Sequence, residues 1–147
     1  MKLVEKLNEK KRSANAGFTL IEIMIVLAII GMIFSFVGVN VMKKFKESKV
    51  QAAKIQIAEF QQALQAYYLA HNMYPNTAQG LDALIHKPSV GKVPDNYPDG
   101  GYFGKKEIPK DPWGNAYQYE CDDYQNFKIY SMGPDGDPGT ADDISAD

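Results

Sequence analysis

The pattern of hydrophobic and polar residues divides the 147-residue chain into three parts. The first part is an apolar run over residues 18–42, in which the twenty residues 23–42 carry no charge. At about 1.5 Å of rise per residue, a helix of twenty residues spans about 30 Å, the thickness of the hydrocarbon core of a bilayer. We therefore predict a membrane-spanning helix over residues 18–42.

Beyond residue 42 the pattern becomes amphipathic, and the same helix is expected to continue. The apolar residues step by three and four positions, which is the spacing of one helix face. They are Val50, Ala53, Ile57, Phe60, Leu64 and Tyr67. Asn72 tolerates the left-handed conformation that ends a helix, and Pro75 cannot continue one. We predict one helix over about residues 19–72, with His71 as a cation or cap in its last turn.

The third part, residues 73–147, reads as a small domain packed on this helix. Thr77 is placed to cap a short helix over about residues 78–86, and a Pro- and Gly-rich loop follows over 88–115. Residues 116–121 and 126–131 alternate and are rich in aromatic residues, which predicts a hairpin. Trp113 and the tyrosines are expected to fill the core. The fold class predicted is α+β.

Composition excludes several classes of function. The net charge is −2, whereas nucleic-acid-binding domains are basic. The single cysteine, Cys121, excludes an intrachain disulfide framework, and two histidines argue against a Cys/His zinc site. Cys121 lies in a predicted strand and is expected to be a small buried residue.

Residues 1–17 form a basic head with five basic and two acidic residues. A secretory signal peptide has an apolar core of about 7–15 residues followed by a cleavage site, so this run is too long for one. The small residues end at Gly17, before the run, so that a cut there would keep the helix. An uncleaved signal anchor is the alternative. Lysines flank both ends of the run, so charge alone leaves the orientation open.

Glu22 is the one ionisable residue inside the apolar run. Such groups cost about 2.5–3.5 kcal/mol at mid-membrane and usually have a partner. Glu22 could reach the headgroup layer near the helix end. A cut after Gly17 would instead create an α-amine at Phe18, and this amine could pair with Glu22 of a neighbouring subunit.

The C-terminal segment is acidic and rich in glycine. Asp135 and the neighbours Asp142 and Asp143 can close a loop from both ends, and glycines allow its carbonyls to point inward. Calcium takes six to eight oxygen ligands of these kinds, while Mg²⁺ usually keeps several waters. The spacing is not that of an EF-hand. The segment therefore indicates either a calcium loop or a solvated acidic tail.

Several of these stretches resemble one family. Residues 17–24, with Gly17, Phe18 and Glu22 at the head of an apolar run, resemble the cleavage and methylation motif of type IV pilin-like proteins. Residues 74–75, 79–84, 109–115 and 131–136 resemble the major pseudopilins of bacterial type II secretion systems. The resemblance covers essentially the whole chain.

This resemblance implies a pilin-like α+β fold: a long helix, a short helix, a long loop, a small antiparallel sheet and a calcium loop. Residues 1–17 would be a leader cut after Gly17, and Phe18 would be N-methylated. Residues 18–42 would form the transmembrane and assembly half of the helix, residues 43–72 its amphipathic half, and residues 73–147 the periplasmic region. The N-terminus would then be cytoplasmic.

The resemblance also implies partners and ligands. Subunits would polymerise into a helical periplasmic filament that helps to export folded proteins across the outer membrane, driven by a cytoplasmic ATPase. Partners would be further copies of the chain, minor pseudopilins, the inner-membrane assembly platform, the prepilin peptidase and the lipid bilayer. Glu22 would act in insertion and subunit recruitment with the Phe18 amine or a partner protein. Calcium would be bound within residues 131–144. Its ligands would be the side chains of Asp135, Asp142 and Asp143 and the backbone carbonyls of Met132 and Pro138.

Three other functions fit the sequence less well. A true type IV pilin usually closes a C-terminal loop with a disulfide, and Cys121 has no partner. Minor pseudopilins usually lack the acidic tail. A hydrolase could use Asp142 and Asp143 as paired carboxylates, but no nucleophile–base motif accompanies them. A structural subunit, not an enzyme, is the function predicted.

The family often has a proline late in the membrane helix, where this chain has Val39. Whether the helix unwinds near Gly38 in the filament is therefore left open.

Overall fold

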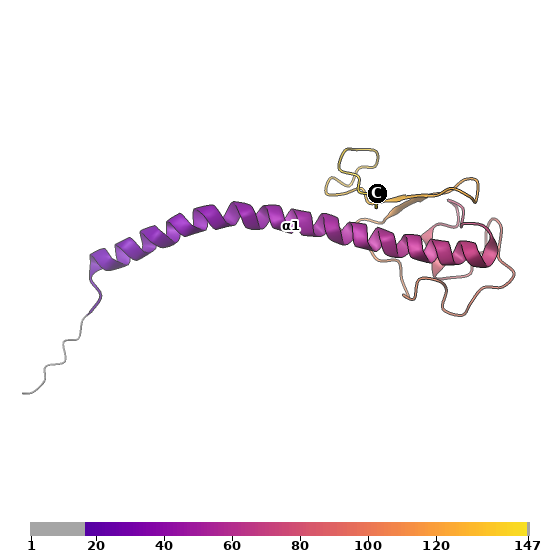
Figure 1. Ribbon diagram of the computed structural model, residues 1–147, viewed down its shortest axis with the longest axis horizontal. Coiled ribbons are helices and arrows are strands. Elements are labelled where there is room, and N and C mark those ends of the chain that lie inside the picture. Colours follow the sequence, from indigo (N-terminus) through magenta and orange to yellow (C-terminus); the bar gives the residue numbers. More distant parts are fainter. Residues whose placement is uncertain (1–16, 147) are drawn as a thin grey trace, which may run out of the picture. The chain divides into compact units, whose positions relative to one another are not determined.

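The computed structural model describes residues 17–146, except for the side chains of residues 36–40. The predicted leader up to residue 16 lies outside the described residues. The chain divides into two compact units, which meet between residues 42 and 43. One helix, α1 (Leu20–His71), contributes to both units (Figure 1). Its 52 residues run without a break through Gly31 and Gly38, within one residue of both predicted ends.

The part of α1 in the first unit buries none of its described side chains. Phe18, just before the helix, is 80% exposed and Phe34 is 72% exposed. The other large apolar residues in this stretch, from Leu20 to Ile33, are exposed as well. Among the residues described, no helix combines the length and the apolar character needed to cross a lipid bilayer. The predicted membrane span over residues 18–42 is therefore not confirmed.

The part of α1 in the second unit carries the core of the molecule. The predicted stripe is confirmed, because five of its six residues are fully buried and Val50 packs at its edge. The buried five are Ala53, Ile57, Phe60, Leu64 and Tyr67. The Phe60 ring stacks on Phe103 at 4.7 Å and meets Tyr117 edge-on at 5.1 Å. Trp113 is partly buried against the same core, as expected.

The C-terminal end of α1 follows the prediction. Asn72 adopts a φ of 54° and donates its N–H to the Tyr68 carbonyl at 2.7 Å. His71 Nε2 lies 2.6 Å from the hydroxyl of Tyr102 in the long loop. Burial lowers the pKa of His71, so a charged cap is disfavoured. His71 therefore holds the loop by a hydrogen bond, a contact that the sequence analysis did not foresee.

The predicted short helix over residues 78–86 is wrong in type and length. The structure has a 3₁₀ helix, η1 (Leu81–Leu84), preceded by a turn. Gly80 has a φ of 61°, which interrupts any helix that begins at residue 78. Thr77 does not cap, because its hydroxyl accepts from Cys121 N–H at 2.8 Å and donates to Asp122 at 2.9 Å. Thr77 instead joins the turn to the hairpin.

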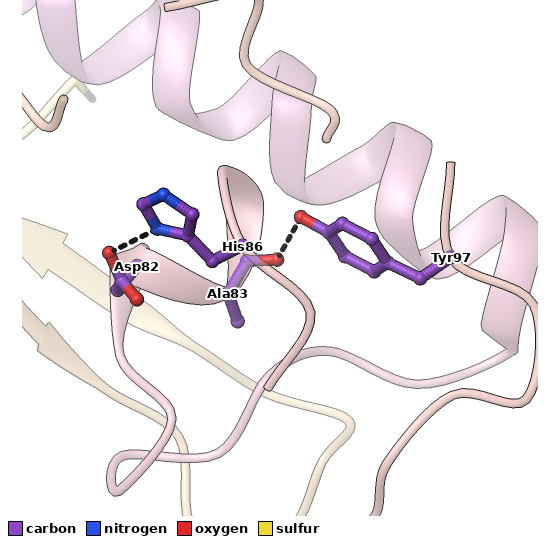
Figure 2. A network of polar contacts seen from close by, with 4 residues as sticks. All are labelled: Asp82, Ala83, His86 and Tyr97. Carbon is purple, nitrogen blue, oxygen red and sulfur yellow. Dashed lines mark hydrogen bonds and ion pairs between the residues drawn. The ribbon is translucent and has the colours of Figure 1, made fainter. Parts of the chain in front are cut away.

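The 3₁₀ helix η1 is held to the long loop by a tyrosine. Figure 2 shows the Tyr97 hydroxyl donating to the carbonyl of Ala83, at 3.1 Å. The same view draws the contact between His86 Nδ1 and Asp82 Oδ1, which are 3.0 Å apart. Both side chains of that second pair are mostly exposed, and exposed ion pairs contribute little stability. The buried leucines of η1 and the Tyr97 bond therefore fix this segment.

The predicted hairpin is present, with strands of three residues each. Strand β1 (Gln118–Glu120) pairs antiparallel with β2 (Lys128–Tyr130), with Tyr119 opposite Ile129. At the turn end of the ladder, side chains take backbone donors of both strand extensions, because Thr77 takes the N–H of Cys121 and Asp123 takes those of Gln125 and Asn126. The strands are therefore shorter than the alternating sequence suggested. Cys121 is buried, as predicted.

Candidate functional site

The start of α1 is a reciprocal cap made by Thr19 and Glu22. The Thr19 hydroxyl accepts from Glu22 N–H at 3.2 Å, and the Glu22 carboxylate accepts from Thr19 N–H at 3.5 Å. This is a capping box, which satisfies backbone donors that a helix start leaves free. The sequence analysis missed Thr19, although the Thr-x-x-Glu spacing was a visible signal. The carboxylate of Glu22 thus lies at the helix start, three residues from the backbone N–H that it binds.

The predicted processing residues precede this cap and lie outside any helix or strand. Apart from the chain neighbours of Gly17, no described residue places an atom within 4 Å of the position that a Cβ would take there. Phe18 is exposed and lies outside α1. The peptide bond between Gly17 and Phe18 is therefore in an open stretch of backbone, two residues before the first turn of the helix.

The acidic loop, residues 131–144, is closed at its base by backbone hydrogen bonds. Ser131 and Ile144 each donate an N–H to the carbonyl of the other, both at 2.9 Å. Just inside this bridge, Gly133 has a φ of 68° and lies directly against the carbonyl of Asp142. A Cβ on residue 133 would overlap that oxygen, so the close approach of the two arms requires glycine.

Asp135 is tied to the far side of this loop by Thr140. The Thr140 hydroxyl donates to Asp135 Oδ2 at 2.8 Å, and Asp137 N–H donates to Oδ1 at 3.2 Å. These hydrogen bonds to the charged form lower the pKa of Asp135. Thr140 also accepts from Asp142 N–H at 3.3 Å. The sequence analysis missed this threonine, because its hydroxyl acts only once the loop is folded.

The two carboxylate oxygens of Asp143 differ in their hydrogen bonding. Its Oδ2 accepts from Gly139 N–H at 2.8 Å. Its Oδ1 is buried and accepts no hydrogen bond from any residue that the structure describes. A buried carboxylate oxygen without a donor is costly, so this atom fits a cation ligand. The carbonyls of Met132 and Pro138 accept no hydrogen bond within residues 17–146, which leaves both lone-pair sets open.

The three predicted carboxylate ligands belong to one loop but are not gathered around one point. Within the described part of the chain, no three His, Cys, Asp or Glu side chains are arranged to hold a metal ion. The Asp135 carboxylate accepts a hydrogen bond from the Thr140 hydroxyl, and the Asp143 carboxylate accepts one from Gly139 N–H. The donor set of carboxylate and carbonyl oxygens nevertheless matches the preference of Ca²⁺. Calcium binding stays a prediction, and the buried Asp143 oxygen, which accepts no hydrogen bond from the described residues, supports it.

Two family models match the sequence. Residues 40–147 match the model described as "Type II secretion system (T2SS), protein G". Residues 12–38 match the prokaryotic N-terminal methylation motif. The second match contains Gly17, Phe18 and Glu22, the residues that the sequence analysis selected.

Curated relatives and a solved structure agree with these matches. A type II secretion system core protein G of Aeromonas hydrophila is 44% identical over 137 residues, covering 92% of this chain and 93% of its own. The Pseudomonas aeruginosa protein of the same name is 42% identical, with 90% and 92% covered. The crystal structure of the major pseudopilin from the type 2 secretion system of enterohaemorrhagic Escherichia coli is similar at a TM-score of 0.63. It is 39% identical and covers 70% of this chain and 86% of its own.

Proposed function

Because the chain belongs to the type II secretion system protein G family, whose members are structural subunits of the pseudopilus and not enzymes, we propose how it is anchored and assembled. The leader is cut after Gly17 and Phe18 is N-methylated. Residues 18–42 then anchor the subunit in the inner membrane, with the N-terminus in the cytoplasm and residues 43–147 in the periplasm. Copies leave the bilayer to form a helical filament that drives export of folded proteins.

The observation that carries this proposal is the exposure of the apolar half of α1. None of the described side chains between Leu20 and Phe34 is buried by the rest of the chain. Exposed apolar patches of this extent mark interaction sites or membrane contacts. In the subunit the lipid bilayer covers this surface, and in the filament the same surfaces of neighbouring copies cover it.

Glu22 is proposed to guide each subunit into the filament. The capping box keeps its carboxylate at the first turn of α1, close to the place where the cut would create the Phe18 amine. In apolar surroundings an isolated carboxylate is costly, so pairing with that amine on a neighbouring copy stabilises the docked state. The partners proposed are further copies, minor pseudopilins, the inner-membrane assembly platform and the prepilin peptidase.

We propose that a bound calcium ion stabilises the folded conformation of the acidic loop. Asp135, Asp142 and Asp143 would hold it together with the carbonyls of Met132 and Pro138. When bound, the ion supplies positive charge that offsets the repulsion among these carboxylates. Asp143 supplies an oxygen that otherwise lacks a partner, and Thr140 holds Asp135 at the rim of the loop.

The assembly role is tested with Glu22→Ala in cells that carry the secretion machinery. We expect the domain to fold and filaments to be lost, while Glu47→Ala, an exposed glutamate elsewhere on α1, assembles normally. Filaments are quantified by sedimentation and electron microscopy. Intact mass of the same preparations checks for loss of residues 1–17 and one added methyl group. Normal filaments from Glu22→Ala would remove the role assigned to this residue.

A further inference from the structure

We propose that Asp111 is a positioning residue for the acidic loop: its carboxylate holds the base of residues 131–144 and thereby raises the affinity of the loop for Ca²⁺. Asp111 lies twenty positions before the loop and is not a predicted ligand. The inference rests on the calcium site proposed above, and it assigns that site a support outside its own sequence.

Asp111 is a buried carboxylate that a turn of the long loop surrounds. It is only 5% exposed. Its Oδ1 accepts from Asn115 N–H at 2.8 Å and from Trp113 N–H at 3.0 Å, and the Asp111 N–H donates to the Asn115 carbonyl at 2.9 Å. One face of the carboxylate is thus fixed by its own turn, residues 111–115, before any contact with the acidic loop.

The other oxygen of Asp111 reaches the acidic loop through Ser131. The Ser131 hydroxyl donates to Asp111 Oδ2 at 2.6 Å. Ser131 is fully buried and forms the backbone bridge to Ile144 that closes the loop. The same hydroxyl accepts from Gly133 N–H at 3.1 Å. A single hydroxyl therefore connects Asp111 to both the bridge and the first turn of the loop.

The contacts of Gly133 extend this connection to the predicted ligands. Gly133 lies against the carbonyl of Asp142, and Asp143 is the residue just before the Ile144 bridge. Gly136, farther along the loop, lies near the Asp111 turn, because a Cβ at this position would stand 3.4 Å from the side-chain amide of Asn115. Asp111 therefore fixes the two arms that carry Asp142 and Asp143 at one end and Met132 at the other.

A structural carboxylate in a core is usually neutralised by a basic side chain, and Asp111 is not. The ion pairs within residues 17–146 join Asp82 to His86 and Glu59 to Lys105. Within the same residues, the carboxylate of Asp111 accepts three hydrogen bonds, one of them from the base of the loop. Groups that orient metal ligands without touching the metal typically change affinity by about 10- to 100-fold when they are mutated.

The test uses the full-length processed protein in detergent and titrates CaCl₂ by calorimetry. Asp111→Asn keeps the shape of the side chain but removes the acceptor for the Ser131 hydroxyl, and we expect Ca²⁺ to bind about 10- to 100-fold more weakly. Asp123→Asn is the matched control. Asp123 also accepts three hydrogen bonds, from Gln125 and Asn126, but in the hairpin turn. Its variant is expected to bind Ca²⁺ as the unsubstituted protein does.

Ser131→Ala provides a second variant that keeps the backbone bridge and serves if Asp111→Asn does not fold. We expect a similar loss of affinity, and the double variant should be little weaker than either single one, because the two residues act through one hydrogen bond. Hydrogen exchange without calcium separates positioning from general stability. The Gly133 and Ile144 amides should exchange faster in Asp111→Asn, while those of α1 between residues 53 and 67 should not change.

The outcomes are distinguishable. If the unsubstituted protein binds Ca²⁺ and both Asp111→Asn and Ser131→Ala bind it equally well, the inference is overturned and the calcium site stands. If the unsubstituted protein itself binds no Ca²⁺, the proposed site fails and the inference fails with it. Equal acceleration of exchange throughout α1 would assign Asp111 a general structural role and would also overturn the inference.

Discussion

The two halves of α1 both carry many apolar side chains, but these side chains have opposite environments. Between residues 53 and 67, five side chains on one face of the helix are fully buried in the core. Between residues 20 and 34 every described side chain is exposed. Phe60 and Phe34 represent this contrast, because one is fully buried and the other is 72% exposed.

The difference shows which half of α1 has its apolar face covered by its own domain. The second half finds its apolar partners within residues 43–146, where the hairpin and the loops cover it. The large apolar side chains described in the first half are exposed, and exposed apolar surfaces of this extent mark contacts with proteins or membranes. We therefore propose that one continuous helix combines a folding surface with an assembly surface.

The largest expected effect separates folding from assembly at the two phenylalanines. Phe60→Ala removes a buried ring that contacts Phe103 and Tyr117, and we expect a loss of about 3–5 kcal/mol in the free energy of unfolding. Phe34→Ala should leave this free energy unchanged, because the ring is exposed in the subunit. Urea unfolding of the full-length protein in detergent, followed by near-UV circular dichroism, measures both. Equal destabilisation by the two substitutions would remove the contrast.

Calcium removal is expected to act on the second unit alone, with an intermediate effect. At a free Ca²⁺ concentration of 100 times the Kd, binding stabilises the folded state by about 2.7 kcal/mol. EGTA should therefore lower the Tm of the unsubstituted protein. Asp143→Asn, which weakens the oxygen that lacks a partner, should melt at the lower temperature with or without EGTA. An identical melt of the unsubstituted protein in calcium and in EGTA would dispose of the site.

The smallest expected effect is a pH dependence from His71, at the end of the folded half of α1. Burial lowers its pKa below the ordinary value of 6.5. The unfolded chain therefore binds this proton at a higher pH than the folded chain does. The contribution of His71 to the free energy of unfolding is constant above pH 6.5 and falls as the pH drops from 6.5 toward the folded pKa.

His71→Gln serves as the reference for this pH effect. Its unfolding free energy should fall less than that of the unsubstituted protein between pH 7.5 and pH 5, measured by urea unfolding. A larger fall in the variant would show that the sign assigned to His71 is wrong.

Features that depend on short-range spacing were predictable from the sequence. The core stripe follows from steps of three and four positions, and the end of α1 follows from Asn72 before Pro75. The hairpin was located correctly from its alternation. The Thr19–Glu22 cap also has a recognisable Thr-x-x-Glu spacing, although the sequence analysis considered only the charge of Glu22.

Features that depend on distant partners were not predictable. Thr77 looked like a helix cap, but the folded chain uses its hydroxyl for Cys121 and Asp122, more than forty positions away. Asp111 is one of many acidic residues in the sequence, and only the fold brings it to Ser131. The calcium ligands were selected by composition and family resemblance. The structure adds the hydrogen bond from Thr140 to Asp135 and the buried Asp143 oxygen that accepts no hydrogen bond within residues 17–146. No sequence pattern predicts either feature.

The central claim is that the exposed half of α1 serves assembly while the buried half serves folding. Ile33 and Ile55 test it most directly, because they are 56% and 54% exposed on the same helix, one on each side of residue 42. The measurement is the fraction of subunits that sediment as filaments for Ile33→Glu and for Ile55→Glu. We predict that Ile33→Glu abolishes filaments and that Ile55→Glu retains them. Filaments from Ile33→Glu in normal amounts would contradict the account.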